Sequence, residues 1–539
     1  MRKKFLVLFG IALASGLLLA ACTGSAGLQG LQGERGSAGS QGSVGSQGPA
    51  GSQGPEGPQG LPGTILIPES PLAYDPSAAH NEGYWYSRYN LSHLVMMSGM
   101  GVQLMPPMEM MQQMMQMAGI PEGPANPYLL QAVYRSGDTH LTIDFTGNDN
   151  DFANFRWDQT QMDKTVTTQA MGYTMIKEII WAKSFASDVE GPNPMNHFRA
   201  LFLRTEAAAQ AQFMMTNLQS ANGLFVSSWR EGVVFNSNLT AQDQLVMLWA
   251  LSELADYTGG QYGWYAAPLS QEQALMMADG LLTAIVDHTT VAPGFLLNMP
   301  ARDLGTALAA LSAYASYTQN ETQRSLVVEE LIPSLTAKLA SRMNEQGKLV
   351  ADGGYSQVAT QGAVINGLVF AYKVTGSEVY KEEALRAWGY METLWDETAG
   401  VYATDPTAFR YVYTASDVAD VVGAFNALLH GLDLDVEQRF ADFFNGAVSL
   451  SGLQIAEGPP TGGGQDEDTI PDPFNAGGEF GQSPVLATEV VYNVASGEWS
   501  VTNQRFTTAY AMALANQMMW IGIWAGSPSV PGHGIPESI

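Results

Sequence analysis

Glycine occupies every third position from Gly24 to Gly63, fourteen times without interruption. This period suits three polyproline-like chains wound around one axis, because only glycine fits where the chains meet. With about 3.1 Å of rise per residue, a fully wound segment of this length would be a rod on the order of 120 Å long. Proline is sparse between the glycines and Ser and Gln are common, so the triple helix is expected to be marginal alone. A flexible Gly/Ser/Gln spacer is the alternative.

The segments GERG at 33–36 and GPEGPQGLPG at 54–63 continue this triplet pattern. They resemble the collagen-like stalks of bacterial surface proteins. The resemblance implies a stalk over residues 23–64 that makes the protein a homotrimer and lifts the rest of the chain away from its anchor.

Residues 1–22 combine a basic start, a short apolar stretch and the tetrapeptide Leu19-Ala20-Ala21-Cys22. The apolar stretch is shorter than a bilayer span requires and ends in small residues, which favours a removed export signal over a transmembrane helix. The tetrapeptide resembles the lipobox of bacterial lipoproteins. That resemblance implies lipidation at Cys22 and anchoring to the cell membrane or outer membrane, on the surface or in the periplasm. An ordinary secretory signal with a chance cysteine is the alternative.

Charge and cysteine content exclude several functions. The chain has 24 basic and 52 acidic residues, a formal charge of −28. Such a surface repels phosphate backbones, so we expect no nucleic-acid partner. Cys22 is the single cysteine, which excludes thiol catalysis and cysteine-ligated zinc. The sequence has no HExxH, GxSxG or Walker motif, and we expect no cofactor and no metal site.

After residue 160 the chain repeats one arrangement. A small-residue-rich apolar helix is followed by a more polar amphipathic helix and then by a loop in which glycine precedes a bulky residue. The loop glycines, which step by 71, 53, 53 and 52 residues, are Gly223, Gly294, Gly347, Gly400 and Gly452. A step near 50 residues suits one helical hairpin with its connections.

Hydrophobic periodicity and capping residues predict two sets of helices. The first helices are expected at 166–186, 241–257, 302–318, 358–374, 415–430 and 503–524. Their partners are expected at 199–220, 270–288, 323–343, 378–395 and 435–447. Segments such as GTALAALSAYASY are apolar around most of their circumference, as expected of helices buried on both sides. Five pairs plus an unpaired sixth helix predict a ring closed by an early helix, which we place near 102–118.

The segment ATQGAVINGLVFAYKVTGSEVYKEEALRAWGYMETLWDETAGVY shows one such pair. It resembles the hairpins of the six-hairpin glycosidase superfamily, the (α/α)6 toroids. The resemblance covers residues 160–525 and contains no catalytic signature. It implies an all-α toroid at 161–539, preceded by a methionine-rich segment at 65–160 that packs on it. Architecture alone does not fix the chemistry.

In such toroids the cleft is a funnel at the end of the ring where the inner helices begin. We select Asp303 and Asp417 there as the acid and base that glycosidic cleavage requires. Because flat aromatic faces stack on sugar rings, the residues expected to bind a substrate are Trp229, Arg230, Trp264, Arg302, Tyr411 and Tyr413. The alternative is that the aspartates cap helix starts and that the aromatic residues belong to the core.

Ten methionines and His93 lie within residues 93–117. Clustered thioethers suit copper(I), and Met-rich stretches of exported copper-handling proteins look similar. At helical spacing, Met108, Met111 and Met115 can instead form one face that packs against the toroid. Acidic loops at 144–151 and 466–472 could hold calcium, although neither matches the spaced calcium-loop pattern.

Three functions follow from these observations. The first is an envelope-anchored surface lipoprotein whose toroid binds or hydrolyses a glycan, neutral or cationic because carboxylates accompany the aromatic residues. The second is a non-catalytic adhesin or structural spacer. The third is copper(I) handling by the methionines.

We expect soluble protein that begins at Thr23 to sediment as a trimer, because uninterrupted Gly-x-y triplets are useful only when three chains share an axis. A chain without residues 24–63 should not form a trimer. Analytical ultracentrifugation of both chains makes the comparison. Equal oligomeric states would support the flexible spacer instead.

Overall fold

The computed structural model describes most of the chain after residue 72. The described residues are 73–89, 108–119, 165–187, 194–259, 269–453, 488–503, 507–522 and 533–536. The chain divides into two compact units, Met1–Ile67 and Pro68–Ile539. All the described residues belong to the second unit. The lipidation predicted at Cys22 and the triple helix predicted at 23–64 fall in the first unit. None of the described helices is both long and apolar enough to cross a membrane.

Six apolar helices form a closed inner ring, in which each packs against the next and the last packs against the first. The last turn of the fifth helix is the π-helical segment η6, Ala427–Gly431. The six are α5 (Thr168–Ala186), α7 (Ala241–Thr258), α10 (Ala301–Tyr317), α13 (Gln357–Thr375), α15 (Ala415–Asn426) and α17 (Thr508–Ile521). Nearly every residue of α10 and α13 is buried, as their apolar circumference predicts.

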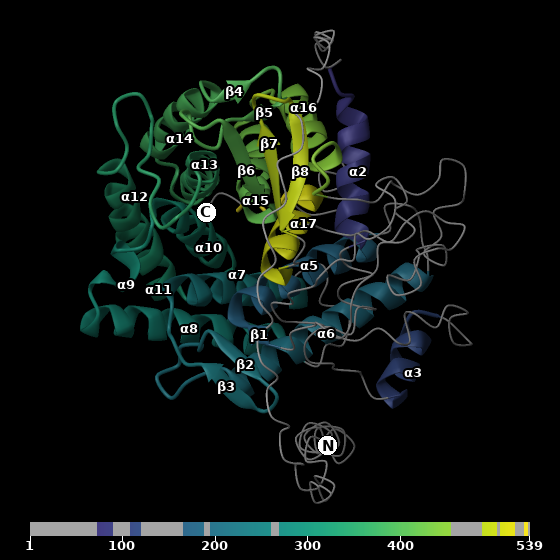
Figure 1. Cartoon of the computed structure of the whole chain (residues 1–539). Helices are drawn as coiled ribbons and strands as arrows, with labels where there is room; N and C mark the ends of the chain where they lie inside the picture. The colour runs from purple at the N-terminus through teal and green to yellow at the C-terminus, as the bar shows by residue number, and fades with distance from the viewer. Residues whose placement is uncertain are drawn as a thin grey trace, which may run out of the picture. The chain divides into compact units, whose positions relative to one another are not determined.

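A second helix packs outside each inner helix. Five of these are α6 (Pro194–Asn217), α8 (Gln271–Val291), the run α11–η5–α12 (Glu321–Leu326, Val327–Leu331, Ile332–Ala340), α14 (Glu378–Glu392) and α16–η7 (Glu437–Phe444, Asn445–Ser449). The predicted all-α (α/α)6 toroid is therefore confirmed, and the predicted helices of all five pairs are present (Figure 1).

The sixth outer helix is α2 (Pro76–Tyr89), which packs against α17 and α16. This corrects the expectation that the ring is closed near 102–118. That segment contains α3 (Met108–Met117), which packs against α6 instead. The polar sequence of α2, PSAAHNEGYWYSRY, gives little sign of this partnership. The helical body thus contains residues on both sides of position 160.

Helix α3 shows what part of the methionine cluster does. Met111 and Met114 are buried, and the Thr205 hydroxyl on α6 lies 3.5 Å from the Met114 sulfur. Met115 also packs against the core. These three residues therefore belong to a face of α3 that packs against the toroid, and they do not form a set of free thioether ligands. The methionines between residues 93 and 107 lie outside the described residues.

Strands are confined to the connections and form three small antiparallel sheets. One sheet joins β1 (Val166–Thr167), β2 (Ser228–Arg230) and β3 (Val233–Asn236), and a two-stranded sheet joins β4 (Trp395–Asp396) and β5 (Val401–Tyr402). The third sheet joins β6 (Arg410–Thr414), β7 (Glu489–Asn493) and β8 (Glu498–Asn503), with Tyr411 opposite Tyr492. Strand β1 runs directly into α5 and β6 into α15, so two sheets lie where inner helices begin (Figure 1).

The repeated loop glycine has a structural cause. Four of the five have positive φ, from 65° to 85°, at Gly223, Gly347, Gly400 and Gly452. After two of the outer helices, a glutamine near the start of the next inner helix binds the loop backbone. Gln244 accepts from the Phe225 N–H at 2.7 Å and donates to its carbonyl at 2.8 Å. Gln361 accepts from the Leu349 N–H at 2.8 Å and donates to the Gly347 carbonyl at 3.0 Å.

Glycines inside the inner helices let three neighbouring helices approach closely. A Cβ atom on Gly305 of α10 would overlap the Ala363 carbonyl oxygen of α13. One on Gly362 of α13 would lie 2.5 Å from the Asp420 carbonyl oxygen of α15. Any larger side chain at these positions would push the helices apart.

We expect Gly362→Ala to lower the free energy of unfolding by about 2 kcal/mol, because overpacking against a backbone outweighs the better helix propensity of alanine. Gly280 on the outer helix α8 is the matched control, since a Cβ there meets nothing within 4 Å. Gly280→Ala should raise the free energy of unfolding by about 0.5–1 kcal/mol. Urea unfolding measures both variants, and a neutral or stabilising Gly362→Ala would contradict the close approach.

Candidate functional site

Three inner helices begin with an aspartate at their third position, but the three differ in their partners. On α7 and α15 the preceding cap is a threonine whose hydroxyl accepts from the aspartate N–H, Thr240 for Asp243 and Thr414 for Asp417. Asp417 completes a capping box by accepting from the Thr414 N–H at 2.8 Å, and its other oxygen accepts from the Ser356 hydroxyl at 2.7 Å. Both oxygens of Asp417 are therefore committed to a helix start.

Asp303 occupies the same position on α10 but does not take part in a capping interaction there. The residue before α10 is Pro300, which has no capping side chain. The missing cap comes from Asp352 in the following loop, which accepts from the Ala301 N–H at 2.8 Å. The Asp303 carboxylate instead faces Arg302 at 3.3 Å and the Tyr355 hydroxyl at 3.3 Å. Among these three aspartates, Asp303 alone takes part in a charged cluster.

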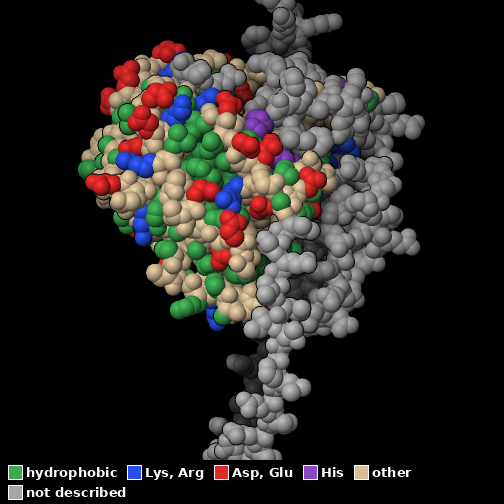
Figure 2. Space-filling view, turned by 90° about the horizontal axis from the view of Figure 1, so that it is seen from above, with side chains coloured by type: hydrophobic (Ala, Val, Ile, Leu, Met, Phe, Trp, Pro, Cys, Tyr) green, Lys and Arg blue, Asp and Glu red, His purple; other side chains and the backbone are tan. Residues whose placement is uncertain are grey.

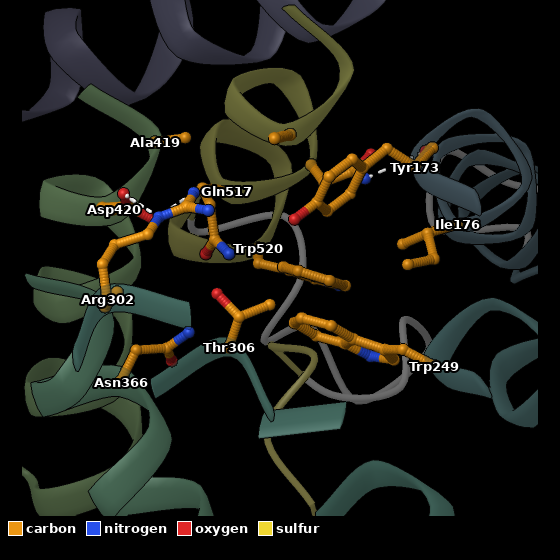
Figure 3. A pocket seen from close by; sticks show the side chains of 13 residues that line it. Tyr173, Ile176, Trp249, Arg302, Thr306, Asn366, Ala419, Asp420, Gln517 and Trp520 are labelled. Carbon is orange, nitrogen blue, oxygen red and sulfur yellow. Dashed lines mark hydrogen bonds and ion pairs between the residues drawn. The ribbon is translucent and has the colours of Figure 1, made fainter. Parts of the chain in front are cut away.

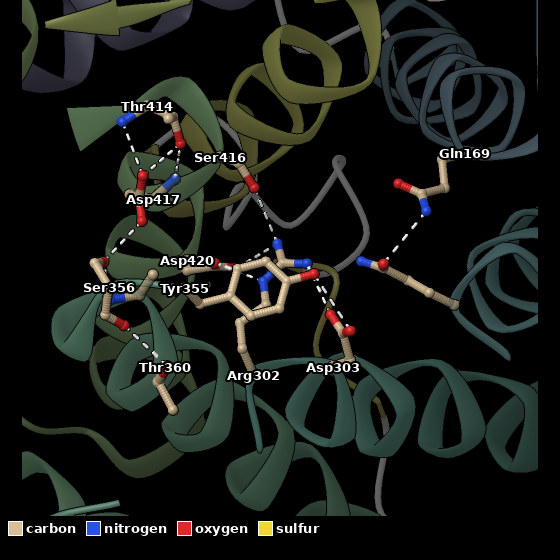
Figure 4. Close-up of polar contacts among 12 residues, drawn as sticks. Gln169, Arg302, Asp303, Tyr355, Ser356, Thr360, Thr414, Ser416, Asp417 and Asp420 are labelled. Carbon is tan, nitrogen blue, oxygen red and sulfur yellow. Dashed lines mark hydrogen bonds and ion pairs between the residues drawn. The ribbon is translucent and has the colours of Figure 1, made fainter. Parts of the chain in front are cut away.

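Arg302 connects α10 to α15 across α13 (Figure 4). Its Nε and Nη2 donate to both oxygens of Asp420 at 2.8 and 3.0 Å. Nη2 also donates to the Ser416 hydroxyl at 3.1 Å, and the guanidinium lies 5.1 Å from the centre of the Tyr355 ring. Such a two-pronged arginine–carboxylate pair is directional as well as strong.

Two carboxyls share one buried guanidinium. Burial raises the pKa of Asp420 to about 6 against the lowering effect of Arg302. Burial likewise raises the pKa of Asp303, with Arg302 and Tyr355 opposing it. Burial also opposes the charge on Arg302, but Asp420 next to it brings the net pKa of the guanidinium well above its ordinary value. The cluster can therefore hold a proton on one carboxyl near neutral pH while the arginine stays charged.

A small cavity of about 30 Å³ lies beside this cluster (Figure 3). Every inner helix contributes to its wall, so the cavity lies on the axis of the ring. The contributing side chains include Tyr173 of α5, Trp249 of α7, Arg302 and Thr306 of α10, Asn366 of α13, Asp420 of α15, and Asn516, Gln517 and Trp520 of α17. We call it the axial cavity.

One wall of the axial cavity is aromatic. The Trp249 and Trp520 rings stack with their centres 5.5 Å apart and their planes at 13°. Phe370 on α13 supports Trp249 edge-on, with the ring centres 6.0 Å apart. The side of the cavity across from the stack carries the charged pair of Arg302 and Asp420 (Figure 3).

Three amide oxygens on the wall of the axial cavity are left without partners among the described residues. Asn366, Asn516 and Gln517 are 8%, 2% and 9% exposed, and within the described part of the chain their side-chain oxygens accept no hydrogen bond. The indole N–H of Trp249 is likewise buried and unpaired there. Each such group costs about 1–3 kcal/mol when it stays unsatisfied. A ligand rich in hydroxyls, or water, would satisfy them.

Most of the predicted substrate-binding residues that the structure describes do not line the axial cavity. Arg302 lines it, whereas the other described candidates do not. Trp229 packs edge-on against Phe213. Arg230 donates to Thr165 and lies over the Phe235 ring.

The two tyrosine candidates both lie in β6. The Tyr411 hydroxyl donates to Asp396 at 2.8 Å, and Tyr413 is fully buried with its hydroxyl on the Tyr402 carbonyl. These contacts match the core alternative. Trp264 lies outside the described residues. The roles of Asp303 and Asp417 as an acid and base stay predictions.

Sequence reasoning missed most of the cavity wall: Tyr173, Trp249, Asn366, Gln517 and Trp520. A signal was present, because AVINGLVF and ALANQMMW place amides within otherwise apolar inner helices. A polar side chain there must face either a partner or a central space.

Metal ligands do not cluster in the part of the chain that the structure describes. No group of three His, Asp or Glu side chains there is placed to hold an ion. The two acidic loops weighed as calcium sites, at 144–151 and 466–472, lie outside the described residues.

Comparisons with known proteins add the following. Residues 21–65 match the family model of the collagen triple helix repeat. A search among curated proteins found no match.

Several solved structures share the architecture at low identity. A sugar epimerase from a ruminal bacterium is 15% identical, over 69% of this chain and 93% of its own, with a TM-score of 0.44. A D-mannose isomerase is 11% identical, over 76% and 96%, with a TM-score of 0.45. A reducing-end-xylose releasing exo-oligoxylanase is 15% identical, over 67% and 91%, with a TM-score of 0.34.

We expect Arg302→Met to lower the free energy of unfolding by about 3–5 kcal/mol at pH 7.5, because it leaves two buried carboxyls without their cation. The loss should be smaller at pH 5, since Asp303 and Asp420 then take up protons in the folded state and the buried charge disappears. Urea unfolding at the two pH values measures this difference.

The matched control is Lys381→Met, which breaks a half-exposed pair with Glu378 at 3.5 Å. Such a pair contributes about 0–1 kcal/mol, and its removal should show no comparable pH dependence. An equal loss at both pH values for Arg302→Met would contradict the assignment of buried charge.

Proposed function

We propose that this protein is a lipoprotein, anchored through Cys22 and raised on a trimeric collagen-like stalk, whose toroid binds a neutral or cationic glycan in the axial cavity. One observation carries the binding proposal. The stacked pair of Trp249 and Trp520 and the unpaired amide oxygens of Asn366, Asn516 and Gln517 line the same central space.

A sugar ring has the two kinds of surface that this wall complements. Its C–H face stacks on flat aromatic rings, and its hydroxyls both donate and accept hydrogen bonds. The amide of Gln517 and the indole of Trp520 lie one turn or less apart on α17, so one ring can contact both.

Charge argues against an anionic ligand. Arg302 is the cation on the wall of the axial cavity, and its guanidinium already pairs with Asp420 and Asp303. Two carboxyls against one guanidinium leave this region negative or neutral. The net charge of −28 adds repulsion over longer distances, and Figure 2 shows acidic side chains spread over the described face of the body.

A more specific proposal is that the toroid also hydrolyses the glycan that it binds. Glycosidic cleavage needs one protonated and one ionised carboxyl. Asp303 and Asp420 have surroundings that favour such a division, because both are buried and both share Arg302. Asp417 keeps its place as a candidate with Asp303, although one of its oxygens caps the start of α15 and the other accepts from Ser356, the N-cap of α13.

Trp520→Leu should weaken glycan binding about 5- to 30-fold, because it removes a stacking surface that contributes about 1–2 kcal/mol. Gln517→Leu should weaken it by a similar factor through the lost hydrogen bond. The mature chain from Thr23 is first screened against a glycan array, and affinities for the glycans that bind are then measured by calorimetry.

Trp499→Leu is the matched control, since Trp499 in β8 is a half-buried tryptophan that does not line the axial cavity. It should leave glycan affinity unchanged. The proposal fails if no neutral or cationic glycan binds, or if all three variants bind alike.

Asp303→Asn tests hydrolysis separately. If Asp303 is catalytic, this variant should bind the glycan and not release product, as judged by chromatography of the reducing ends. Unchanged turnover would remove Asp303 from the mechanism.

A further inference from the structure

The described end of the chain, residues 533–536, docks on the ends of two inner helices, and we call it the C-terminal clasp. The Asn426 amide of α15 donates to the His533 carbonyl at 2.8 Å. Ile535 packs beside Gly431 at the end of η6, where a Cβ atom would lie 3.6 Å from its side chain. The clasp therefore covers the end of the ring opposite the starts of the inner helices.

Two histidines hold the clasp through a face-to-face stack. The His430 and His533 rings lie 3.4 Å apart between centres, with planes at 8°. His430 Nε2 lies 3.1 Å from the Ile521 carbonyl, and His533 Nδ1 lies 2.5 Å from the Trp520 carbonyl. Because a carbonyl only accepts, these two nitrogens carry the ring protons. The opposite nitrogen of each ring is then unprotonated in the neutral state.

A third histidine lies within reach of this stack. His80 on α2 is 4% exposed, and neither ring nitrogen has a partner among the described residues. Burial, with the nearby His430, lowers the pKa of His80 to about 4. Burial and the same neighbour lower that of His533 to about 4. Burial also lowers the pKa of His430, against Glu437 on α16 and Asp433 after η6.

The sign of the pH effect follows from these directions. A histidine with a lowered pKa stabilises the folded contact above its ordinary pKa near 6.5, and that stability is lost as the pH falls toward 4. For one imidazole with pKa of about 4 in place and 6.5 when released, release is favoured roughly 60-fold more at pH 4.5 than at neutral pH. A second proton on a stack 3.4 Å apart adds like-charge repulsion.

The clasp contacts the aromatic wall of the axial cavity directly. Gly534 lies against the Trp520 indole so closely that a Cβ atom there would overlap the ring. Gly534 also has a φ of +67°, which L side chains rarely adopt. Trp520 is thus held by Trp249 and by the clasp, through both its ring and its carbonyl.

We propose that the C-terminal clasp positions Trp520 in the wall of the axial cavity and that acid releases the clasp through His430 and His533, which lowers the affinity of the cavity for its glycan. The effect on affinity rests on the proposed function; the release of the clasp does not. A metal site is the other use of clustered histidines. Parallel rings cannot aim their lone pairs at one ion, and no three-ligand group is present in the described part of the chain.

The test compares wild type with a double variant that keeps the hydrogen bonds but does not titrate. Gln offers an N–H near the position of Nε2 and Asn one near Nδ1, so the variant combines His430→Gln with His533→Asn. Hydrogen exchange of the C-terminal peptide in the mature chain, corrected for intrinsic rates, is followed by mass spectrometry from pH 7.5 to 4.5. Trp520 is followed by fluorine NMR of protein containing 5-fluorotryptophan, with Trp520→Phe to identify its signal.

Wild type should lose protection of the peptide by tenfold or more as the pH falls, and the Trp520 signal should shift over the same range. The double variant should show neither change. His288→Gln, on the outer helix α8, is the matched control and should behave as wild type. Gly534→Ala should reproduce the acid state at pH 7.5. Equal pH responses in wild type and double variant, or none in wild type, would overturn the proposal.

The glycan affinity separates the two proposals. If the cavity binds glycan, the affinity of wild type should fall at least tenfold between pH 7.5 and 4.5 while that of the double variant does not. If no glycan binds at any pH, the proposed function fails, and hydrogen exchange still tests whether acid releases the clasp. A clasp that opens in wild type without any loss of glycan affinity would overturn the link between the two.

Discussion

The close packing of α10, α13 and α15 at Gly305 and Gly362 is the constraint on which the site depends. Arg302 must reach from α10 past α13 to Asp420 on α15, and bidentate geometry at 2.8 and 3.0 Å tolerates little movement. Glycine at both contacts lets each pair of backbones nearly touch. A buried arginine without this partner would be costly, so helix packing and the charged cluster stabilise each other.

The repeated hairpins provide an internal comparison that a single sequence otherwise lacks. Asp243, Asp303 and Asp417 hold equivalent positions on α7, α10 and α15, so a difference among them reflects something other than helix capping. Pro300 removes the local cap of α10, and Asp352 replaces it from another loop. This substitution frees Asp303 to join Arg302 and Tyr355. The departure from the repeat, rather than the repeat, distinguishes the start of α10 from those of α7 and α15.

The sequence predicts the inner helices well because each is apolar on all sides, and the ring follows from their number and spacing. It does not predict α2 as the closing helix, since a polar segment such as PSAAHNEGYWYSRY acquires its role only from contact with α17. For the site, helix starts pointed to Arg302 and Asp303, whereas Asn366 and Gln517 were missed. Their importance depends on which residues face one another across the ring, and periodicity along one helix carries no such information. Tyr411 and Tyr413 show the converse, because aromatic residues in a loop strand can serve the core.

The pairing of α2 with α17 gives the body an order of assembly. The first described helix of the toroid is the partner of its last inner helix, and α17 must also meet α5 to close the ring. A growing chain that ends before α17 lacks one side of that seam. Contacts between such distant segments form slowly, because the long intervening chain must first be brought together. The ring of a growing chain therefore cannot close before α17 is made.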